Sequence, residues 1–280
     1  MNFNLFSLLF CLKKEMVKIE EKYYKIWITL IEGIGIKRYT NLINKFKTRK
    51  NIFNASKQEL INIPLIDEKI IKNILDSSKR SLAKEHLRYM EKNNIDIISL
   101  EDEAYPLKLI NIYNPPICVY IKGNKSILKN KSIGIIGCRD CTEYGKMVSK
   151  KFSYELAKEN INIISGLARG IDSFAHLGAV IANGKTIAVL GNGIDITYPK
   201  ENYYLEEKII EKGGAIITEY PIKTAPEKMN FPARNRIISG ISNGILVVEA
   251  KRKSGTLITV DFALEQGRDV FVIPREYKFC

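Results

Sequence analysis

The chain has 280 residues, of which 45% are hydrophobic and 27% are charged, a composition that is ordinary for a soluble globular protein. Its length suits one large domain or two unequal ones. It carries 44 Lys and Arg against 31 Asp and Glu, a formal net charge of +13. No run of about 18 uncharged apolar residues occurs, which excludes a membrane-spanning helix. The positive charge favours a polyanionic partner such as a nucleic acid, although a lysine-rich composition by itself explains part of it.

The cysteines and histidines argue against a metal or disulfide framework. Five cysteines are an odd set, and a chain of this length can fold without them, which indicates a reducing cytosol. Cys138 and Cys141 form a lone C-x-x-C, and neither His86 nor His176 has the spacing of a zinc ligand set. The pair also lies in a glycine turn instead of opening a helix, as a redox motif does. We expect no metal and no cofactor.

The first residues resemble a short secretion signal, but their basic residues follow the apolar run and no cleavage site is apparent. We therefore expect residues 1–15 to be a disordered or mis-annotated extension, with translation starting at Met16, and the protein to be cytoplasmic.

Residues 16–93 have the apolar spacing of a small helical domain. Predicted helices cover 19–31, 36–47, 56–62, 67–78 and 80–93. The first two flank an IEGIG turn at 31–35, which is typical of a helix-hairpin-helix whose amides can hold a DNA phosphate. A tight helical corner needs the same glycines, so the turn is either a DNA contact or a structural corner.

Residues 94–280 change to short Ile- and Val-rich runs. Predicted strands cover 95–99, 117–121, 132–136, 161–164, 186–190, 214–218, 244–248 and 269–273. Predicted helices between the later strands cover 143–159, 171–182, 201–212, 233–242 and 257–266. Strands without polar alternation are covered by helices on both faces. The alternation predicts an α/β domain with a Rossmann-like, doubly wound, mostly parallel sheet.

Unusual clusters follow the five predicted strands from 132–136 to 244–248, at the edge where an open parallel sheet binds its ligands. Five loops are expected to meet at one edge: 137–145, 165–172, 191–202, 219–236 and 249–256. Their glycines allow backbone amides to approach an anion, the following helix N-termini add partial positive charge, and hydroxyls add donors. These residues are Gly137, Gly166, Gly170, Gly191, Gly193 and Gly255, with Ser165, Ser254 and Thr256. Glycines after strands also serve as plain turns, so only their number makes the pattern informative.

Arginine is retained at this edge in a lysine-rich chain, which favours forked recognition of phosphate. The residues are Arg139, Arg169, Arg234 and Arg236. Lys200 is followed by Tyr203, a spacing that suits phosphate pairing and base stacking. Tyr203 is equally explained as an aromatic residue that packs inward from a helix.

Known nucleotide and catalytic fingerprints match poorly. G-x-x-x-x-G-K-[ST] is absent, as is G-x-G-x-x-G after the strand at 132–136. Asp172 and His176 lie one turn apart, a spacing that also serves capping and packing, and we expect a structural role for the pair. No catalytic residue is predicted.

Taken together, the stretches GCRDCTEYG, SGLARGIDSFAH, TYPKENYYL, FPARNRIISGIS and GRDVFVIP resemble the DNA-processing protein A family, DprA or Smf. The resemblance covers about residues 20–274. It implies an extended Rossmann domain after a small sterile-alpha-motif or helix-hairpin-helix-like domain. It also implies a homodimer that binds and protects single-stranded DNA, and that loads the RecA recombinase during natural transformation without catalytic turnover.

The resemblance also assigns residues. Arg139 and Lys200 become contacts to the DNA backbone, and Tyr203 becomes the stacking aromatic. Ser165, Gly166 and the arginines of the Arg234-Asn235-Arg236 motif line the same pocket. Cys138 replaces the small hydroxyl residue that usually precedes the motif arginine, and the chain stops at VIPREYKFC where family members continue, which suggests a truncated C-terminus.

An enzyme is the alternative. SGTLITVDFALEQG at 254–267 resembles the glycine-rich stretch of lonely-guy phosphoribohydrolases, which hydrolyse a nucleotide N-glycosidic bond. Their catalytic Glu follows the Thr on the helix, where this chain has Val260 and Asp261.

Overall fold

A computed structural model describes residues 5–252 and 254–274, with side chains from Met16 onward. The chain divides into two compact units. The smaller unit comprises the residues up to Ser99 together with Pro116–Cys118, and the larger unit comprises Leu100–Pro115 and the residues from Val119 onward. No helix among the described residues is long and apolar enough to cross a membrane.

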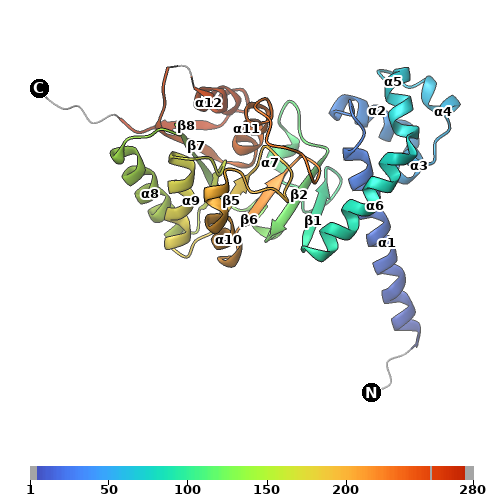
Figure 1. The fold of residues 1–280 in the computed structure, drawn as a ribbon, viewed down its shortest axis with the longest axis horizontal. Helices are drawn as coiled ribbons and strands as arrows, with labels where there is room; N and C mark the ends of the chain where they lie inside the picture. Colours follow the sequence, from blue (N-terminus) through green and yellow to red (C-terminus); the bar gives the residue numbers. More distant parts are fainter. Residues whose placement is uncertain (1–4, 253, 275–280) are drawn as a thin grey trace, which may run out of the picture. The chain divides into compact units, whose positions relative to one another are not determined.

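The smaller unit is helical apart from one strand (Figure 1). Its elements are α1 (Leu5–Thr29), α2 (Ile36–Phe46), α3 (Arg49–Phe53), α4 (Lys57–Ile61), α5 (Glu68–Leu75), α6 (Ser77–Lys92) and β1 (Ile95–Ser99). Trp27 and Leu42 are fully buried in its core. Helix starts follow local capping: the Ser56 hydroxyl accepts from the Glu59 amide, and the Glu59 carboxylate accepts from Ser56 in return.

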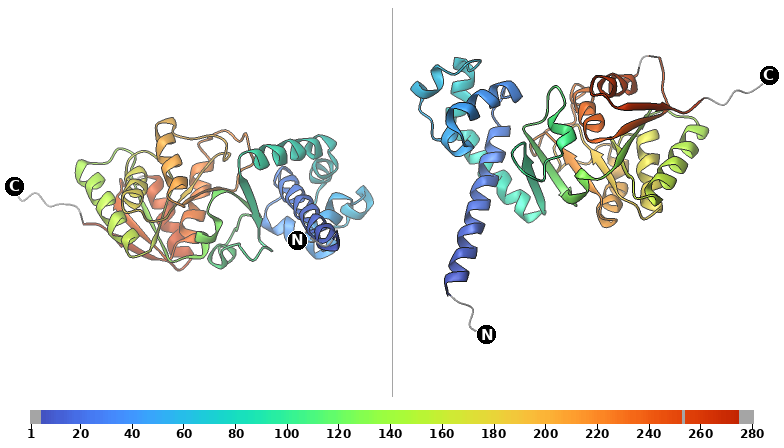
Figure 2. Two further views of the ribbon diagram at one scale, coloured as in Figure 1. Left: turned by 90° about the horizontal axis from the view of Figure 1, so that it is seen from below. Right: turned by 180° about the vertical axis from the view of Figure 1, so that it is seen from behind.

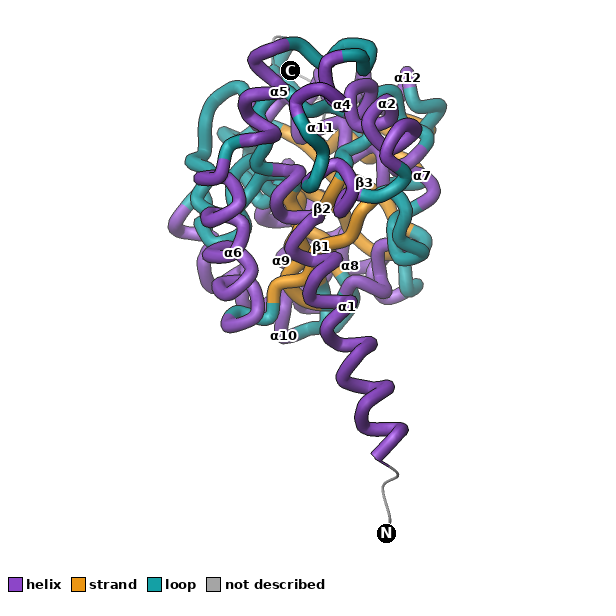
Figure 3. Tube along the Cα trace, turned by 90° about the vertical axis from the view of Figure 1, so that its right-hand side faces the viewer, coloured by secondary structure: helices purple, strands orange, loops and turns teal. Residues whose placement is uncertain are grey.

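Helices α1 and α6 and strand β1 contact one another in this unit, and Figure 3 shows the two helices in front of the strand. The domain boundary expected after Asn93 therefore differs from the observed division, because β1 lies with the helices. The expectation for residues 1–15 stays open: residues 1–4 are outside the described part, and the backbone of residues 5–15 is the beginning of α1.

The turn between α1 and α2 is held by its own unit. Gly33 has a φ of +87°, which favours glycine. The Arg38 guanidinium donates to the Gly33 carbonyl at 2.8 Å and to the Leu65 carbonyl at 2.9 Å. These bonds account for the glycine turn as a structural corner, and the alternative of a DNA contact stays a prediction.

The larger unit contains the doubly wound sheet. Its strands are β2 (Cys118–Gly123), β3 (Ser132–Gly137), β4 (Asn162–Ser165), β5 (Thr186–Val189), β6 (Ala215–Thr218), β7 (Gly244–Glu249) and β8 (Asp269–Val272). Their order in the sheet is β2-β6-β5-β4-β3-β7-β8. β2 pairs with β6 antiparallel and the other pairs are parallel, which confirms the mostly parallel α/β sheet.

Helices pack against both faces of this sheet (Figures 1 and 2). The α-helices are α7 (Leu107–Ile110), α8 (Glu143–Lys158), α9 (Ile171–Ile181), α10 (Tyr203–Glu211), α11 (Asn230–Ile241) and α12 (Gly255–Glu265). Two 3-10 helices are η1 (Lys125–Lys129) and η2 (Lys200–Asn202). Helix α8 packs on α9, and α11 packs on α12 and α7. Because both faces are covered, every residue of β4, β5 and β6 is buried.

The strand order places a topological switch between β3 and β7. From β3 the chain winds through β4, β5 and β6 in one direction, and β7 and β8 then continue from β3 in the other. The loops that leave β3 and β7 therefore diverge to opposite faces and open a crevice, where ligands of such sheets bind.

His176 lies in the core beneath this edge and is fully buried. Its Nδ1 is 2.7 Å from the Thr186 hydroxyl, which itself donates to the Ile163 carbonyl. Nδ1 therefore carries the proton in this pair. Asp172 accepts instead from the Gly166 amide at 3.1 Å, so both residues have structural hydrogen bonds.

The buried histidine predicts acid sensitivity. Burial, with a smaller effect of Arg234, lowers the pKa of His176 from 6.5 to about 3. Below pH 6.5 the unfolded chain binds a proton at this imidazole and the folded chain does not. The free energy of unfolding therefore decreases as the pH is lowered from 6.5 to about 3. Between pH 7 and pH 4.5 we expect a loss of about 2.5 kcal/mol from this group.

Urea unfolding of the wild type and of His176→Asn at both pH values measures this loss. The asparagine amide retains a donor for Thr186 but does not take up a proton in this range. The variant should therefore lose about 2.5 kcal/mol less than the wild type. Equal losses in the two proteins would contradict the role given to His176.

Candidate nucleic-acid interface

A pocket of about 600 Å³ lies at the crevice between the ends of β3 and β7. All five loops expected at this edge contribute to its lining, together with the first turns of α11 and α12. Contributions include Arg139 after β3, Ala168 after β4, Tyr198 after β5, Lys228 after β6 and Lys251 after β7. The predicted convergence of the loops is therefore confirmed.

Glycines let the loops approach one another. Gly170 has a φ of +73°, and a Cβ atom there would lie 2.5 Å from the Cys138 carbonyl oxygen. A Cβ atom on Gly137 would lie 2.9 Å from the Glu249 carbonyl oxygen. These two glycines therefore fix the backbone of the loop that carries Arg139, which is exposed.

The amides of two predicted anion-binding positions have partners inside the protein. The Gly166 amide donates to the Asp172 carboxylate, and the Gly193 amide donates to the Thr224 carbonyl at 2.9 Å. Ser165 is also fully buried, and its hydroxyl donates to the Ile135 carbonyl at 2.7 Å. The expectation that Ser165 and Gly166 line the pocket is therefore wrong, because both belong to the packing beneath it.

The N-terminus of α12 does open into the pocket. Ser254, Gly255 and Thr256 line it, and nothing lies within 4 Å of a Cβ atom built on Gly255. The Ser254 hydroxyl is buried and has no hydrogen-bond partner among the described residues. A helix N-terminus with a spare hydroxyl is receptive to an anion.

Arg234 supplies a fixed positive charge at the pocket. Its side chain is buried, and its guanidinium donates to the Gly166 carbonyl at 3.0 Å and to the Val189 carbonyl. Burial lowers the pKa of Arg234 to about 10, with Asp172 acting in the opposite direction, so the group stays protonated at neutral pH. Asn235, its neighbour, accepts from Arg234 Nε and also lines the pocket.

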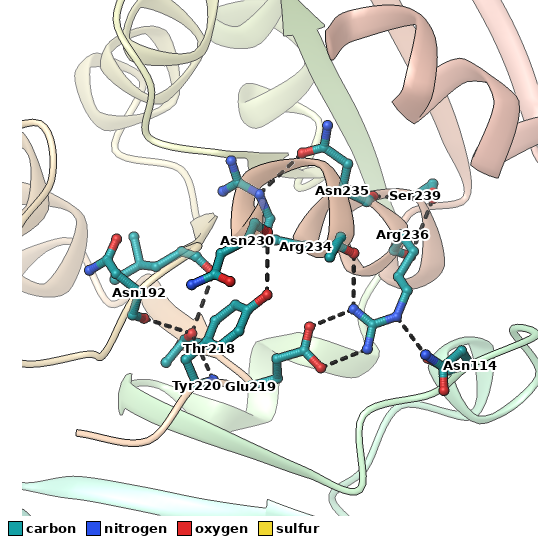
Figure 4. Close-up of polar contacts among 12 residues, drawn as sticks. Asn114, Asn192, Thr218, Glu219, Tyr220, Asn230, Arg234, Asn235, Arg236 and Ser239 are labelled. Carbon is teal, nitrogen blue, oxygen red and sulfur yellow. Dashed lines mark hydrogen bonds and ion pairs between the residues drawn. The ribbon is translucent and has the colours of Figure 1, made fainter. Parts of the chain in front are cut away.

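Arg236 points elsewhere (Figure 4). Its guanidinium forms two hydrogen bonds with the Glu219 carboxylate, at 2.5 and 2.6 Å, and donates to the Asn114 carbonyl at 2.8 Å. The expectation that both arginines of the motif line one pocket is wrong for Arg236. The two residues lie two positions apart on α11, and a helix turns by about 200° over two residues, so their side chains point to nearly opposite sides.

Three predicted residues lie on the β5–α10 side, outside the pocket lining. Arg169 is exposed and forms an ion pair with Glu201. Lys200 is exposed, and Tyr203 is 50% exposed with its hydroxyl 2.7 Å from Glu207. Tyr203 therefore does not pack inward, and its ring is accessible from solvent.

An aromatic pair in the pocket was not predicted. The rings of Tyr198 and Phe231 are 5.5 Å apart, and the Arg139 guanidinium lies 5.7 Å from the Phe231 ring centre. Lys228 and Lys251 add charge at the same place. In the sequence, Tyr198 lies two residues before Lys200 and Phe231 opens the FPARNR stretch. Both stretches were recognised, but only the fold shows that the two rings lie together.

The pocket contains no metal ligand set: among the residues whose placement is described, no group of three His, Cys, Asp or Glu could hold an ion. Cys138 is buried and Cys141 is half-buried, and burial raises the pKa of both thiols. The pocket instead combines fixed cations, aromatic rings and an open helix N-terminus.

An open α/β sheet with this pocket at its switch point defines a Rossmann-like ligand-binding domain. Residues 96–279 match the model of the family described as DNA recombination-mediator protein A. The chain therefore belongs to that family.

Individual relatives agree with the family match. The chain is similar to the protein Smf of Synechocystis, with 36% identity over 92% of this chain and 66% of that protein. It is similar to the DNA processing protein DprA of Bacillus subtilis, with 41% identity over 73% of this chain and 68% of that protein. The matched region thus spans about two thirds of these relatives.

Two solved structures share the fold. One is the DNA processing protein A of Streptococcus pneumoniae, with a TM-score of 0.74, 33% identity and coverage of 92% of this chain and 88% of that chain. The other is the DNA processing protein A of Helicobacter pylori, described for its single-stranded DNA binding mode. It has a TM-score of 0.60, 29% identity and coverage of 65% of this chain and 83% of that chain.

Proposed function

We propose that this protein binds single-stranded DNA without sequence preference and acts as a recombination mediator. In this proposal it protects incoming strands in the cytoplasm during natural transformation and helps load the RecA recombinase, as a homodimer and without catalytic turnover. Support comes from the family to which the chain belongs and from the Helicobacter pylori relative, whose single-stranded DNA binding mode has been described.

The observation that carries the proposal is the pocket at the switch between β3 and β7. It presents Arg139, Lys228 and Lys251 at the surface, with the charge of Arg234 fixed behind them. Only Asp140 and the buried Asp172 contribute carboxylates to its described lining. Cations at an open helix N-terminus favour phosphate, and phosphate contacts carry no sequence information.

In the proposed mechanism, Arg139 and Lys200 neutralise consecutive phosphates of the strand. The exposed ring of Tyr203 stacks on one base, and the Tyr198–Phe231 pair accepts another at the pocket. A base in a duplex has both faces covered by its neighbours. Stacking therefore favours the single strand over the double strand.

A salt titration tests this function. The affinity of the purified protein is measured for a single-stranded oligonucleotide, a duplex and a mononucleotide. Two phosphate contacts predict that log K falls against log[salt] with a slope of at least about 1.4 for the single strand. We expect the single strand to bind more tightly than both other ligands. A preference for the mononucleotide, with no salt slope, would contradict the proposal.

The same samples test the enzyme alternative. Incubation with nucleoside monophosphates should release no free base above the protein-free rate. On α12, Val260 and Asp261 stand near the place where the phosphoribohydrolases have their catalytic Glu. Asp261 is exposed and does not line the pocket. Steady release of base would favour the N-glycoside hydrolase.

A further inference from the structure

A second pocket of the larger unit, of about 420 Å³, lies on the side of α11 that carries Arg236. It is lined by the segment 111–114, by Glu219 and Tyr220 after β6, and by the end of α12. None of these residues lines the pocket at the β3–β7 switch. The two pockets are therefore separate sites.

The charge of Arg236 is already neutralised inside this second pocket. Both carboxylate oxygens of Glu219 accept from its guanidinium, and Asn114 accepts from its Nε (Figure 4). The remaining acidic side chain of the lining is the exposed Glu265. With one cation and two carboxylates the lining is net negative, so it disfavours a phosphate.

One hydrogen-bond acceptor among the lining residues has no donor in the described part of the chain. The amide nitrogen of Gln266 donates to the Arg236 carbonyl at 3.1 Å. Its Oε1 atom is buried and has no partner among the described residues. A buried acceptor without a donor is unfavourable, and its partial negative charge makes this side of the lining more receptive to a cation than to an anion.

Three aromatic side chains also line this pocket. Tyr113 is 85% exposed, and Phe262 and Tyr220 are half-buried. Burial, with the nearby Glu219, raises the pKa of Tyr220 to about 12, so its ring bears no charge at neutral pH. Aromatic faces beside a carboxylate attract a cation that carries an apolar stem.

We propose that this second pocket binds an organic cation, a guanidinium or alkylammonium group on an apolar stem. The charged head pairs with Glu265, and the stem lies against Phe262 and Tyr113. The ligand is either a free amine or guanidine or the side chain of an arginine or lysine in a peptide. The proposal does not depend on the DNA-binding function.

Calorimetric titration of the full chain tests it with two probes, agmatine for the free cation and N-acetyl-arginine amide for the peptide side chain. The uncharged N-acetyl-citrulline amide serves as the control probe. We expect saturable binding of at least one cationic probe and none of the citrulline compound. Glu265→Gln should weaken binding at least about tenfold, because it removes a charge-assisted hydrogen bond.

The matched control is Glu155→Gln, which removes an exposed carboxylate on α8 that does not line this pocket and should leave the affinity unchanged. Phe262→Ala should also weaken the binding of the cationic probe. Preference for agmatine identifies a free cation, and preference for the arginine amide identifies a peptide side chain. The proposal is overturned if neither probe saturates, if citrulline binds equally, or if Glu265→Gln binds as the wild type does.

Discussion

The variant Arg139→Ala/Lys200→Ala is expected to bind a single-stranded oligonucleotide at least about tenfold more weakly than the wild type at moderate salt. Each side chain is exposed and is proposed to pair with a phosphate, and hydrogen bonds to charged groups contribute about 1.5–3 kcal/mol before solvent screening. Loss of two phosphate contacts should also reduce the slope of log K against log[salt] by about 1.4. Fluorescence anisotropy over a series of salt concentrations measures both quantities.

The control for this prediction is Lys150→Ala/Lys151→Ala on α8, which removes the same charge from two exposed positions outside the pocket. It should lower affinity only slightly and leave the slope nearly unchanged. If both double variants lose affinity equally, net charge and not the assigned contacts governs binding. If the Arg139 and Lys200 variant keeps wild-type affinity and slope, the assignment of these two residues fails.

The second large effect concerns the ion pair between Arg236 and Glu219, which lines the second pocket. We expect Glu219→Gln to lower the free energy of unfolding by about 3–5 kcal/mol, because it leaves the buried Arg236 guanidinium without a countercharge. Replacing both partners with apolar residues, as Glu219→Leu/Arg236→Met, removes the unpaired charge. The double variant should recover most of the loss.

Urea unfolding of the two variants and the wild type measures these differences. Arg236 Nε and Nη1 also hold the carbonyls of Asn114 and Ala233, so the recovery in the double variant should be incomplete. A single variant as stable as the wild type would show that the pair is dispensable.

Most of the larger unit could be predicted from the sequence, because its signals are local and mutually consistent. Short Ile and Val runs without alternation indicated buried parallel strands, and the observed strands agree with them to within a few residues. The elements missed are α3, α7 and η1, each of five residues or fewer. Helices so short have no periodicity to detect, and tertiary packing determines whether they form.

The candidate site was predicted less completely. The sequence identified which loops meet, because topology alone brings the ends of parallel strands together. It did not show which side of α11 each arginine takes, nor that Ser165 and the Gly166 amide have partners in the interior. The contact between Tyr198 and Phe231 joins two distant loops, and no local pattern indicates it.

The location of a bound strand tests the central claim most directly. A crystal structure of the protein with oligo-dT should show consecutive phosphates at Arg139, Lys200 and the N-terminus of α12, with thymine rings against Tyr203 or the Tyr198–Phe231 pair. An oligonucleotide bound on another surface, with the crevice between β3 and β7 empty, would contradict the account.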